Sequence, residues 1–128
     1  MKGYVSKMKK IFEQGLLYDF YGDLLTPHQQ KVYEDAVYGD LSLGEIAEKF
    51  NISRPGVHDL LKRCDKILSA YESKLHLVER FQKTKDTVRQ IKTLAEESKG
   101  LLRENVNTDE ITEKLTKIEE FSVRLLDE

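Results

Sequence analysis

Residues 42–63, SLGEIAEKFNISRPGVHDLLKR, decide the fold of this chain. Ser42, with Glu45 three residues later, is the capping pattern that begins a helix. The helix over 43–50 carries a small residue, Ala47, where a second helix can cross it closely. The stretch therefore begins with a short helix that is suited to contact with another helix.

The second half of this stretch supplies a turn and a second helix. Asn51 belongs to the few non-glycine residue types that tolerate a left-handed backbone, and Ile52 supplies an apolar plug. Ser53 can cap a new helix, whose first turn tolerates Pro55. Its inward residues are then Val57, Leu60 and Leu61. A helix, a tight turn and a second helix with an accessible opening turn meet the requirements of a helix-turn-helix, whose second helix enters the major groove of DNA.

The segments before residue 42 also have helical spacing, and no segment shows a sustained two-residue alternation, so the predicted fold class is all-α. A first helix is expected over 5–24, with a break near Gly15 or Gly22. Its inward face is predicted to hold Met8, Ile11, Phe12, Leu16, Tyr18 or Asp19, Phe20 and Leu24. A second helix is expected over 27–38, capped by Thr26.

The segment after the helix-turn-helix has no proline or glycine between residues 57 and 99, and its apolar residues keep helical spacing. A helix of that length either projects into a partner or breaks, and the polar stretch 82–87 is the expected place of a bend. Gly100 and the polar stretch 103–108 predict a boundary. Asn107 is then expected to cap a last helix over 108–126. The apolar stripe of this helix is Ile111, Leu115, Ile118, Ser122 and Leu125, which indicates packing against another helix.

These elements suggest two parts. Residues 1–80 are predicted to form an N-terminal helix plus a helix-turn-helix domain, and residues 81–128 a C-terminal helical extension. The apolar seams at 67–94 and 111–125 exceed what three short helices can cover. We therefore expect the extension to dimerise, giving a homodimer.

Length and charge limit the classes of function that the chain can have. Its 128 residues are too few for a large multi-domain enzyme, and its net charge is −2. It has no apolar run near the roughly 18 residues of a membrane span and no signal-peptide pattern, so a cytoplasmic protein without membrane contact is expected. The charge is uneven, because residues 53–92 carry ten bases and five acids. Nucleic acid can be bound through this positive band.

Enzymatic function is not expected. His28, His58 and His76 lack the spacing of metal ligands, and the chain has no glycine-rich phosphate loop. Cys64 shares an apolar stripe with Leu60, Leu61 and Leu68, so it is predicted to be a core residue rather than a nucleophile. No cofactor or metal is implied by the sequence.

Residues 24–68, LLTPHQQKVYEDAVYGDLSLGEIAEKFNISRPGVHDLLKRCDKIL, resemble the fourth region of bacterial RNA polymerase sigma factors. Over about residues 8–80 the chain resembles the YlxM-like family of small helix-turn-helix proteins. The resemblance implies a three-helix core, a DNA-binding regulatory function and a link to the signal recognition particle pathway. It makes 43–50 the supporting helix and 54–63 the recognition helix. The candidate nucleic-acid-binding residues are then Ser42, Ser53, Arg54, His58, Lys62 and Arg63.

The sequence is compatible with two kinds of binding function. The ligand is duplex DNA or structured RNA, or the chain is a protein-interaction module that binds signal recognition particle protein or RNA without sequence-specific DNA binding. For individual residues, the alternatives are a solvated cation at Arg54 and an ordinary surface histidine at His58. For Lys62 and Arg63, the alternative is a charged helix face stabilised by spaced ion pairs.

Overall fold

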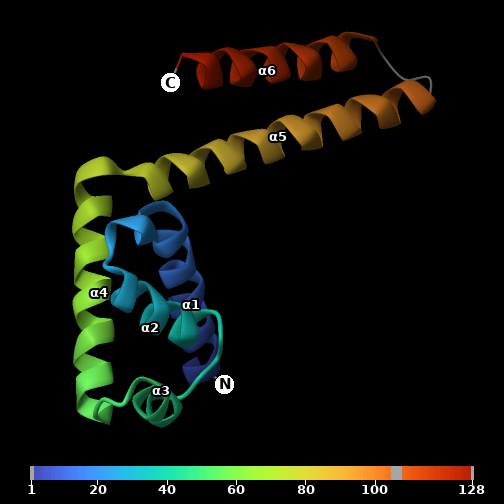
Figure 1. Ribbon diagram of the computed structural model, residues 1–128. Coiled ribbons are helices and arrows are strands. Elements are labelled where there is room, and N and C mark those ends of the chain that lie inside the picture. Colours follow the sequence, from blue (N-terminus) through green and yellow to red (C-terminus); the bar gives the residue numbers. More distant parts are fainter. Residues whose placement is uncertain (1, 105–107, 128) are drawn as a thin grey trace. The chain divides into compact units, whose positions relative to one another are not determined.

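The structure is a computed structural model that describes residues 2–104 and 108–127 (Figure 1). Within these residues every regular element is helical, as predicted. The helices are α1 (Lys2–Tyr21), the 3-10 turn η1 (Gly22–Leu24), α2 (Pro27–Val37), α3 (Leu43–Phe50), α4 (Arg54–Leu75), α5 (Leu77–Arg103) and α6 (Thr108–Leu126). The chain divides into two compact units, Met1–Val78 and Glu79–Glu128. No helix of the described part is long and apolar enough to cross a membrane.

The first unit, which holds α1 to α4, has two clusters of buried side chains. One cluster consists of Tyr21, Leu25, Tyr33, Val37, Cys64, Leu68 and Val78. The other consists of Val32, Ile46, Ala47 and Val57, with Phe50, Ile52, Leu60 and Leu61 packed against it. Both clusters include residues of α4, so this helix is the common wall of the core.

The predicted caps of three helices are confirmed. The backbone N–H groups of Gln29, Glu45 and Gly56 donate to the hydroxyls of Thr26, Ser42 and Ser53 at 3.2, 3.1 and 3.0 Å. Thr26 and Ser42 each belong to a complete capping box. Local hydroxyl chemistry therefore sets where α2, α3 and α4 begin.

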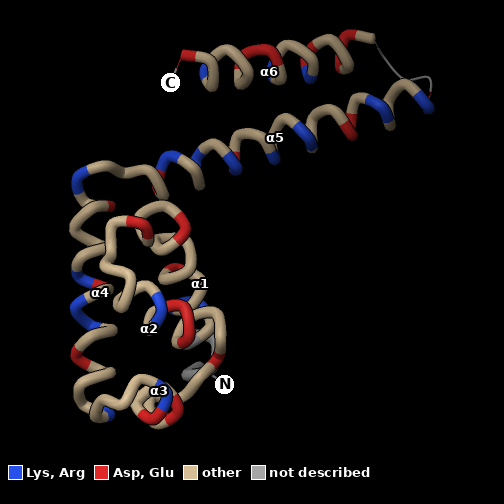
Figure 2. The backbone as a smooth tube through the Cα atoms, viewed as in Figure 1, with Lys and Arg blue, Asp and Glu red and all other residues tan. Residues whose placement is uncertain are grey.

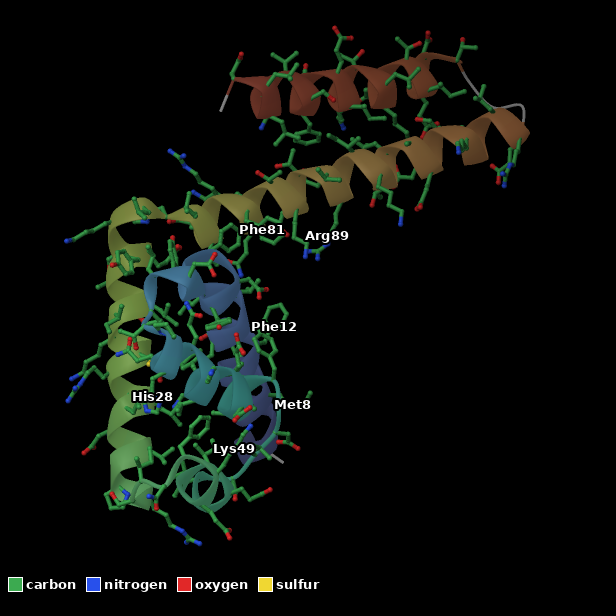
Figure 3. The ribbon with its side chains drawn as sticks, viewed as in Figure 1. Met8, Phe12, His28, Lys49, Phe81 and Arg89 are labelled. Carbon is green, nitrogen blue, oxygen red and sulfur yellow. The ribbon has the colours of Figure 1, made fainter. Side chains whose placement is uncertain are left out.

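The predicted inward face of α1 is wrong in part. Met8 is 54% exposed and Phe12 is 63% exposed, and Figure 3 shows both on the outer side of α1. Phe20 and Leu24 are exposed as well, whereas Ile11 and Leu16 pack against the core. Of the predicted alternatives Tyr18 and Asp19, Tyr18 is the one turned inward, together with Gln14 and Tyr21, which were not predicted. The polar ends of Gln14, Tyr18 and Tyr21 find carboxylates at Asp65, Glu34 and Glu72.

The break in α1 falls at Gly22, one of the two predicted glycines. At Gly15 the helix continues, and the hydroxyl of Tyr38 donates to the Gly15 carbonyl at 3.0 Å. A Cβ at Gly22 would lie 2.8 Å from ring atoms of Tyr18. Glycine is therefore the residue that fits at this break.

The predicted bend at 82–87 is also wrong, since α5 runs continuously through these residues and through Gly100 to Arg103. The chain breaks earlier, at His76, which has a φ of 56°. The hydroxyl of Tyr21 accepts the N–H of Leu77 at 3.1 Å, and the carboxylate of Glu72 accepts the N–H of Val78 at 3.0 Å. These side chains supply partners for the first N–H groups of α5, and histidine is one of the residues enriched in the left-handed region.

The second unit contains most of α5 and all of α6, which run alongside in opposite directions (Figure 1). Ser98 of α5 and Ile111 of α6 are buried. The ammonium of Lys114 lies 2.6 Å from the carboxylate of Glu97. Leu115 departs from the predicted stripe because it is 53% exposed, while Ile118, Ser122 and Leu125 are partly buried. The predicted cap at Asn107 lies outside the described residues.

Candidate nucleic-acid interface

α3 and α4 are joined by the tight turn over 51–53. Asn51 has φ 56° and ψ 47°, as predicted for the turn, and the N–H of Ile52 donates to the Ala47 carbonyl at 3.0 Å. Ala47 and Val57 are both buried in one cluster, so the small residue lies where the two helices meet. This arrangement is a helix-turn-helix with the first turn of α4 at the surface.

Ser42 and Ser53 are exposed, and each accepts a backbone N–H at the start of a helix. Their hydroxyls are therefore already engaged as caps. A hydroxyl oxygen in this role still has its own O–H to donate. The two serines mark the N-terminal ends of α3 and α4, where the helix dipole favours negative charge.

Arg54 bridges the first turns of the two helices. Its guanidinium lies against the backbone of Gly44, because a Cβ at that position would be 2.7 Å from Nη2 and 3.0 Å from Nε. Any side chain at position 44 would have to displace the guanidinium. Arg54 nevertheless remains exposed, so a ligand can reach it.

His58 and Lys62 follow Arg54 at four-residue steps along α4, and both are exposed. Nδ1 of His58 lies 3.9 Å from Oδ1 of its neighbour Asp59, which is a long and exposed contact. The same four-residue step leads to Lys66, which is exposed and which the sequence reasoning did not select. From Arg54 to Lys66 the row spans about 18 Å at roughly 1.5 Å per residue.

Arg63 lies apart from this row. It lines a groove of about 500 Å³ between the start of α2 and α4, together with Thr26, His28, Gln29, Ile52, Gly56, Asp59 and Leu60. The ring of His28, labelled in Figure 3, contacts Phe50 edge-on with 5.7 Å between centroids. His28 and Gln29 are further residues that sequence reasoning missed, because only the packing of α2 on α4 brings them beside Arg63.

The acidic residues of α4 are arranged unevenly. Asp65 accepts hydrogen bonds from the hydroxyl of Tyr33 at 2.7 Å and from the amide of Gln14 at 3.0 Å. Glu72 accepts the hydroxyl of Tyr21 at 2.6 Å. Burial, and then these carboxylates, raise the pKa of Tyr33 and of Tyr21, which keeps both phenols protonated as donors.

As a result, two of the three acids of α4 point into the core, and Asp59 is the acid on its exposed side. The exposed bases of α4 are Arg54, Lys62, Arg63, Lys66 and Lys74. Figure 2 shows Lys and Arg along α4. The outer surface of this helix is therefore positively charged although the whole chain has a net charge of −2.

Cys64 is fully buried, as predicted, and burial raises the pKa of its thiol to about 11. A thiol in this state is a poor nucleophile and a poor metal ligand. In the part of the chain that the structure describes, no group of three or more His, Cys, Asp or Glu side chains could hold a metal ion.

Comparisons with known proteins agree with this geometry. Residues 8–108 match the family UPF0122, described as "Putative helix-turn-helix protein, YlxM / p13 like". A UPF0122 protein of Desulforamulus reducens is 44% identical, over 75% of this chain and 92% of its own length. UPF0122 proteins of Bacillus thuringiensis and Bacillus mycoides are each 39% identical, over 84% of this chain and 98% of their own lengths. The chain therefore belongs to the UPF0122 family of YlxM/p13-like helix-turn-helix proteins.

Proposed function

We propose that this protein is a regulatory, non-enzymatic protein that binds duplex DNA, or structured RNA, with the first turns of α4. The observation that carries this proposal is the one-sided charge of the helix. Tyrosine hydroxyls hold Asp65 and Glu72 inside, so bases dominate its outer surface. Neutralisation of phosphates by such bases supplies much of the affinity of nucleic-acid-binding proteins.

Each candidate residue has a distinct role in this proposal. Arg54 contacts a base edge or a phosphate from its position over Gly44, and His58 and Lys62 contact the backbone along the same row. Arg63 holds a phosphate at the mouth of its groove. Ser42 and Ser53 hold phosphates at the N-terminal ends of α3 and α4.

The organisation of the chain completes the proposal. Residues 1–80 form the binding part, and residues 81–128 pair two copies into a homodimer. Two recognition helices would double the number of phosphate contacts, and two-fold pairing is the commonest form of self-association. The protein would act in the cytoplasm.

Binding to labelled duplex DNA at several salt concentrations tests the function. Three phosphate contacts per copy, from Arg54, Lys62 and Arg63, predict a slope of log K against log salt of about −2.7 per copy. Arg54→Ala is expected to weaken binding by about 10- to 100-fold, since a good arginine contact contributes about 1–3 kcal/mol. Lys117→Ala on α6 is the control and should bind like the wild type. An affinity for duplex DNA that changes neither with salt concentration nor with Arg54→Ala would refute the proposal.

A second candidate function is a protein-interaction module for signal recognition particle protein or RNA. Pro55 and Gly56 occupy the opening turn of α4 and offer no side chain that reads bases. In addition, the exposed Phe12 lines a mostly apolar groove of about 320 Å³ on α1 and α2, with Ile11, Gly15, Leu16, Asp19, Val37 and Tyr38. Such a groove suits an apolar side chain of a protein partner.

A pull-down from cytoplasmic extract distinguishes the two candidates. Particle components that remain bound after nuclease treatment, and that Phe12→Ala releases, would support the second candidate. Enrichment of DNA fragments that share a sequence, lost with Arg54→Ala, would support the first.

A further inference from the structure

The α5–α6 hairpin leaves apolar side chains uncovered on α5. Ile91, Leu94 and Leu101 are partly buried, but Val88 and Leu102 are 50% and 65% exposed. Val88 and Leu102 lie on one flank of the helix, beside the inward row. This flank also carries Lys85, Lys92 and Lys99, which are exposed and repeat every seven residues. One side of α5 is therefore both apolar and basic.

α6 has a corresponding flank of opposite charge. Leu115, Val123 and Leu126 are 53%, 50% and 84% exposed, whereas Ile111 is buried. The acid on this flank is Glu119, which is exposed, while Glu120 and Asp127 lie farther round, on the outer side of the helix. Glu119 and Val123 also line a shallow hollow of about 480 Å³ on α6, together with Thr116, Glu120 and Arg124.

Both flanks lie on the same side of the hairpin. The ion pair between Glu97 and Lys114 closes one edge. On each helix, the exposed flank lies beside the inward row, on the side opposite the Glu97–Lys114 pair. Because both helices are right-handed and run in opposite directions, these two flanks fall on one common face of the hairpin. We name this the open face, formed by Lys85, Val88, Lys92, Lys99 and Leu102 of α5 and Leu115, Glu119, Val123 and Leu126 of α6.

The open face is self-complementary. Its charged residues are Lys85, Lys92 and Lys99 on α5 and Glu119 on α6. Figure 2 shows the basic residues along α5. A two-fold axis parallel to the helices would place α5 of one copy over α6 of the other. An axis perpendicular to the helices, in the plane of the face, would instead place α5 of one copy on α5 of the other. The lysines of the two copies would then face each other, which is unfavourable.

We propose that the open face binds the open face of a second copy of this chain, with α5 of each copy packed on α6 of the other in an antiparallel four-helix bundle. This inference rests on the proposed pairing through residues 81–128 and is independent of nucleic-acid binding. The exposed Val88, Leu102, Leu115 and Val123 would be buried in the bundle, which is the apolar contribution that holds such bundles together.

The structure also gives the register of the two copies. Glu97 and Lys114 are level, so Lys92, five residues before Glu97, is level with Glu119, five residues after Lys114. By the same count Val88 is level with Val123. A two-fold axis parallel to the helices preserves these levels, so Lys92 of each copy meets Glu119 of the second copy. Among the described residues Lys92 pairs with Glu96 at 4.0 Å, a long and exposed contact from which its ammonium can reach another carboxylate.

Charge reversal in the full chain tests this register. Lys92→Glu and Glu119→Lys, each alone, place two like-charged pairs in every homodimer, and each is expected to raise the dimer dissociation constant at least about tenfold. When the two variants are mixed, both pairs become opposite again, and a heterodimer should form with nearly the wild-type dissociation constant. Lys117→Glu makes the same charge change outside the open face and should dimerise like the wild type. Sedimentation velocity and native mass spectrometry measure these equilibria.

The outcomes separate the proposals. Single variants that dissociate and a mixture that recovers would support the register. A wild type that is dimeric but indifferent to both reversals would overturn the open face as the interface while keeping the pairing. A wild type that is monomeric at all concentrations would overturn both the open face as an interface and the homodimer. Neither result would change what the DNA titration of Arg54→Ala says about nucleic-acid binding.

Discussion

The hydroxyl of Tyr21 donates to Glu72 at 2.6 Å and at the same time accepts the N–H of Leu77 at 3.1 Å. The same Glu72 oxygen accepts the N–H of Val78 at 3.0 Å. A side chain of α1 thus supplies partners where α4 ends and α5 begins. The left-handed residue at this break, His76, is followed at once by N–H groups that need such partners.

Tyr21→Phe is expected to lower the free energy of unfolding by about 1–3 kcal/mol, because the N–H of Leu77 loses its acceptor in a part-buried place. Tyr71→Phe is the matched control. Its ring stacks on Tyr21 with 6.0 Å between centroids, but its hydroxyl is not part of this network. Urea titrations of the two variants measure the difference, and equal losses would contradict the role of the Tyr21 hydroxyl.

The turn of the helix-turn-helix is expected to depend on the backbone of Asn51, whose φ is 56°. Asn51→Val should destabilise the protein by about 1–2 kcal/mol, because a branched side chain is strained in the left-handed region. Asn51→Gly should change the stability by only a few tenths of a kcal/mol. Thermal unfolding followed by circular dichroism measures both. If the two variants melt at the same temperature, the conformation at 51 does not limit stability.

Gly44 is expected to position Arg54 for its ligand. Gly44→Ala places a methyl group 2.7 Å from Nη2, so the guanidinium has to move, while alanine itself is compatible with a helix. The dissociation constant for duplex DNA should rise about as much as it does for Arg54→Ala, and the double variant should bind no more weakly than Arg54→Ala. Fluorescence anisotropy measures all three. If Gly44→Ala binds DNA like the wild type, the contact between the Arg54 guanidinium and Gly44 does not contribute to binding.

Stability is expected to fall at alkaline pH. Burial raises the pKa of Cys64 from 9.0 to about 11, so the folded protein keeps a proton that the unfolded chain loses. The stabilisation is complete below about pH 9 and is lost as the pH rises toward 11, by up to about 2–3 kcal/mol. Burial also raises the pKa of Tyr33 and of Tyr21, which extends the loss to higher pH.

Urea titrations at pH 8 and pH 10.5 measure this loss. Cys64→Ala is the comparison, since it removes the thiol and should show a smaller fall over the same interval. A stability that stays constant or rises between these two pH values would contradict the assignment.

The starts of α2, α3 and α4 could be predicted because their signals are local. In each case a hydroxyl caps an N–H three residues later, as Ser42 does for Glu45. The orientation of α1 and the helix break at His76 could not be predicted, because distant partners determine them. Met8 and Phe12 stay outside so that Gln14 and Tyr21 can reach α4.

In the candidate site, too, features with local signals could be predicted and features that depend on helix packing could not. The position of Arg54 at the start of α4 follows from the cap at Ser53, whereas its contact with Gly44 follows from the way α3 crosses α4. Lys66 could have been selected from its four-residue step after Lys62. The place of His28 and Gln29 beside Arg63 depends on how α2 packs, for which the sequence has no local signal.

The electrostatic potential at the surface of α4 depends on hydrogen bonds inside the protein, because these bonds hold two of its carboxylates inward. A homologue that replaced Tyr33 with a residue lacking a hydroxyl would leave Asp65 with the Gln14 amide as its inward partner, and so less firmly held away from an approaching polyanion. Relatives that lose this tyrosine are therefore expected to lose the aspartate as well, so that core and ligand-facing positions evolve together.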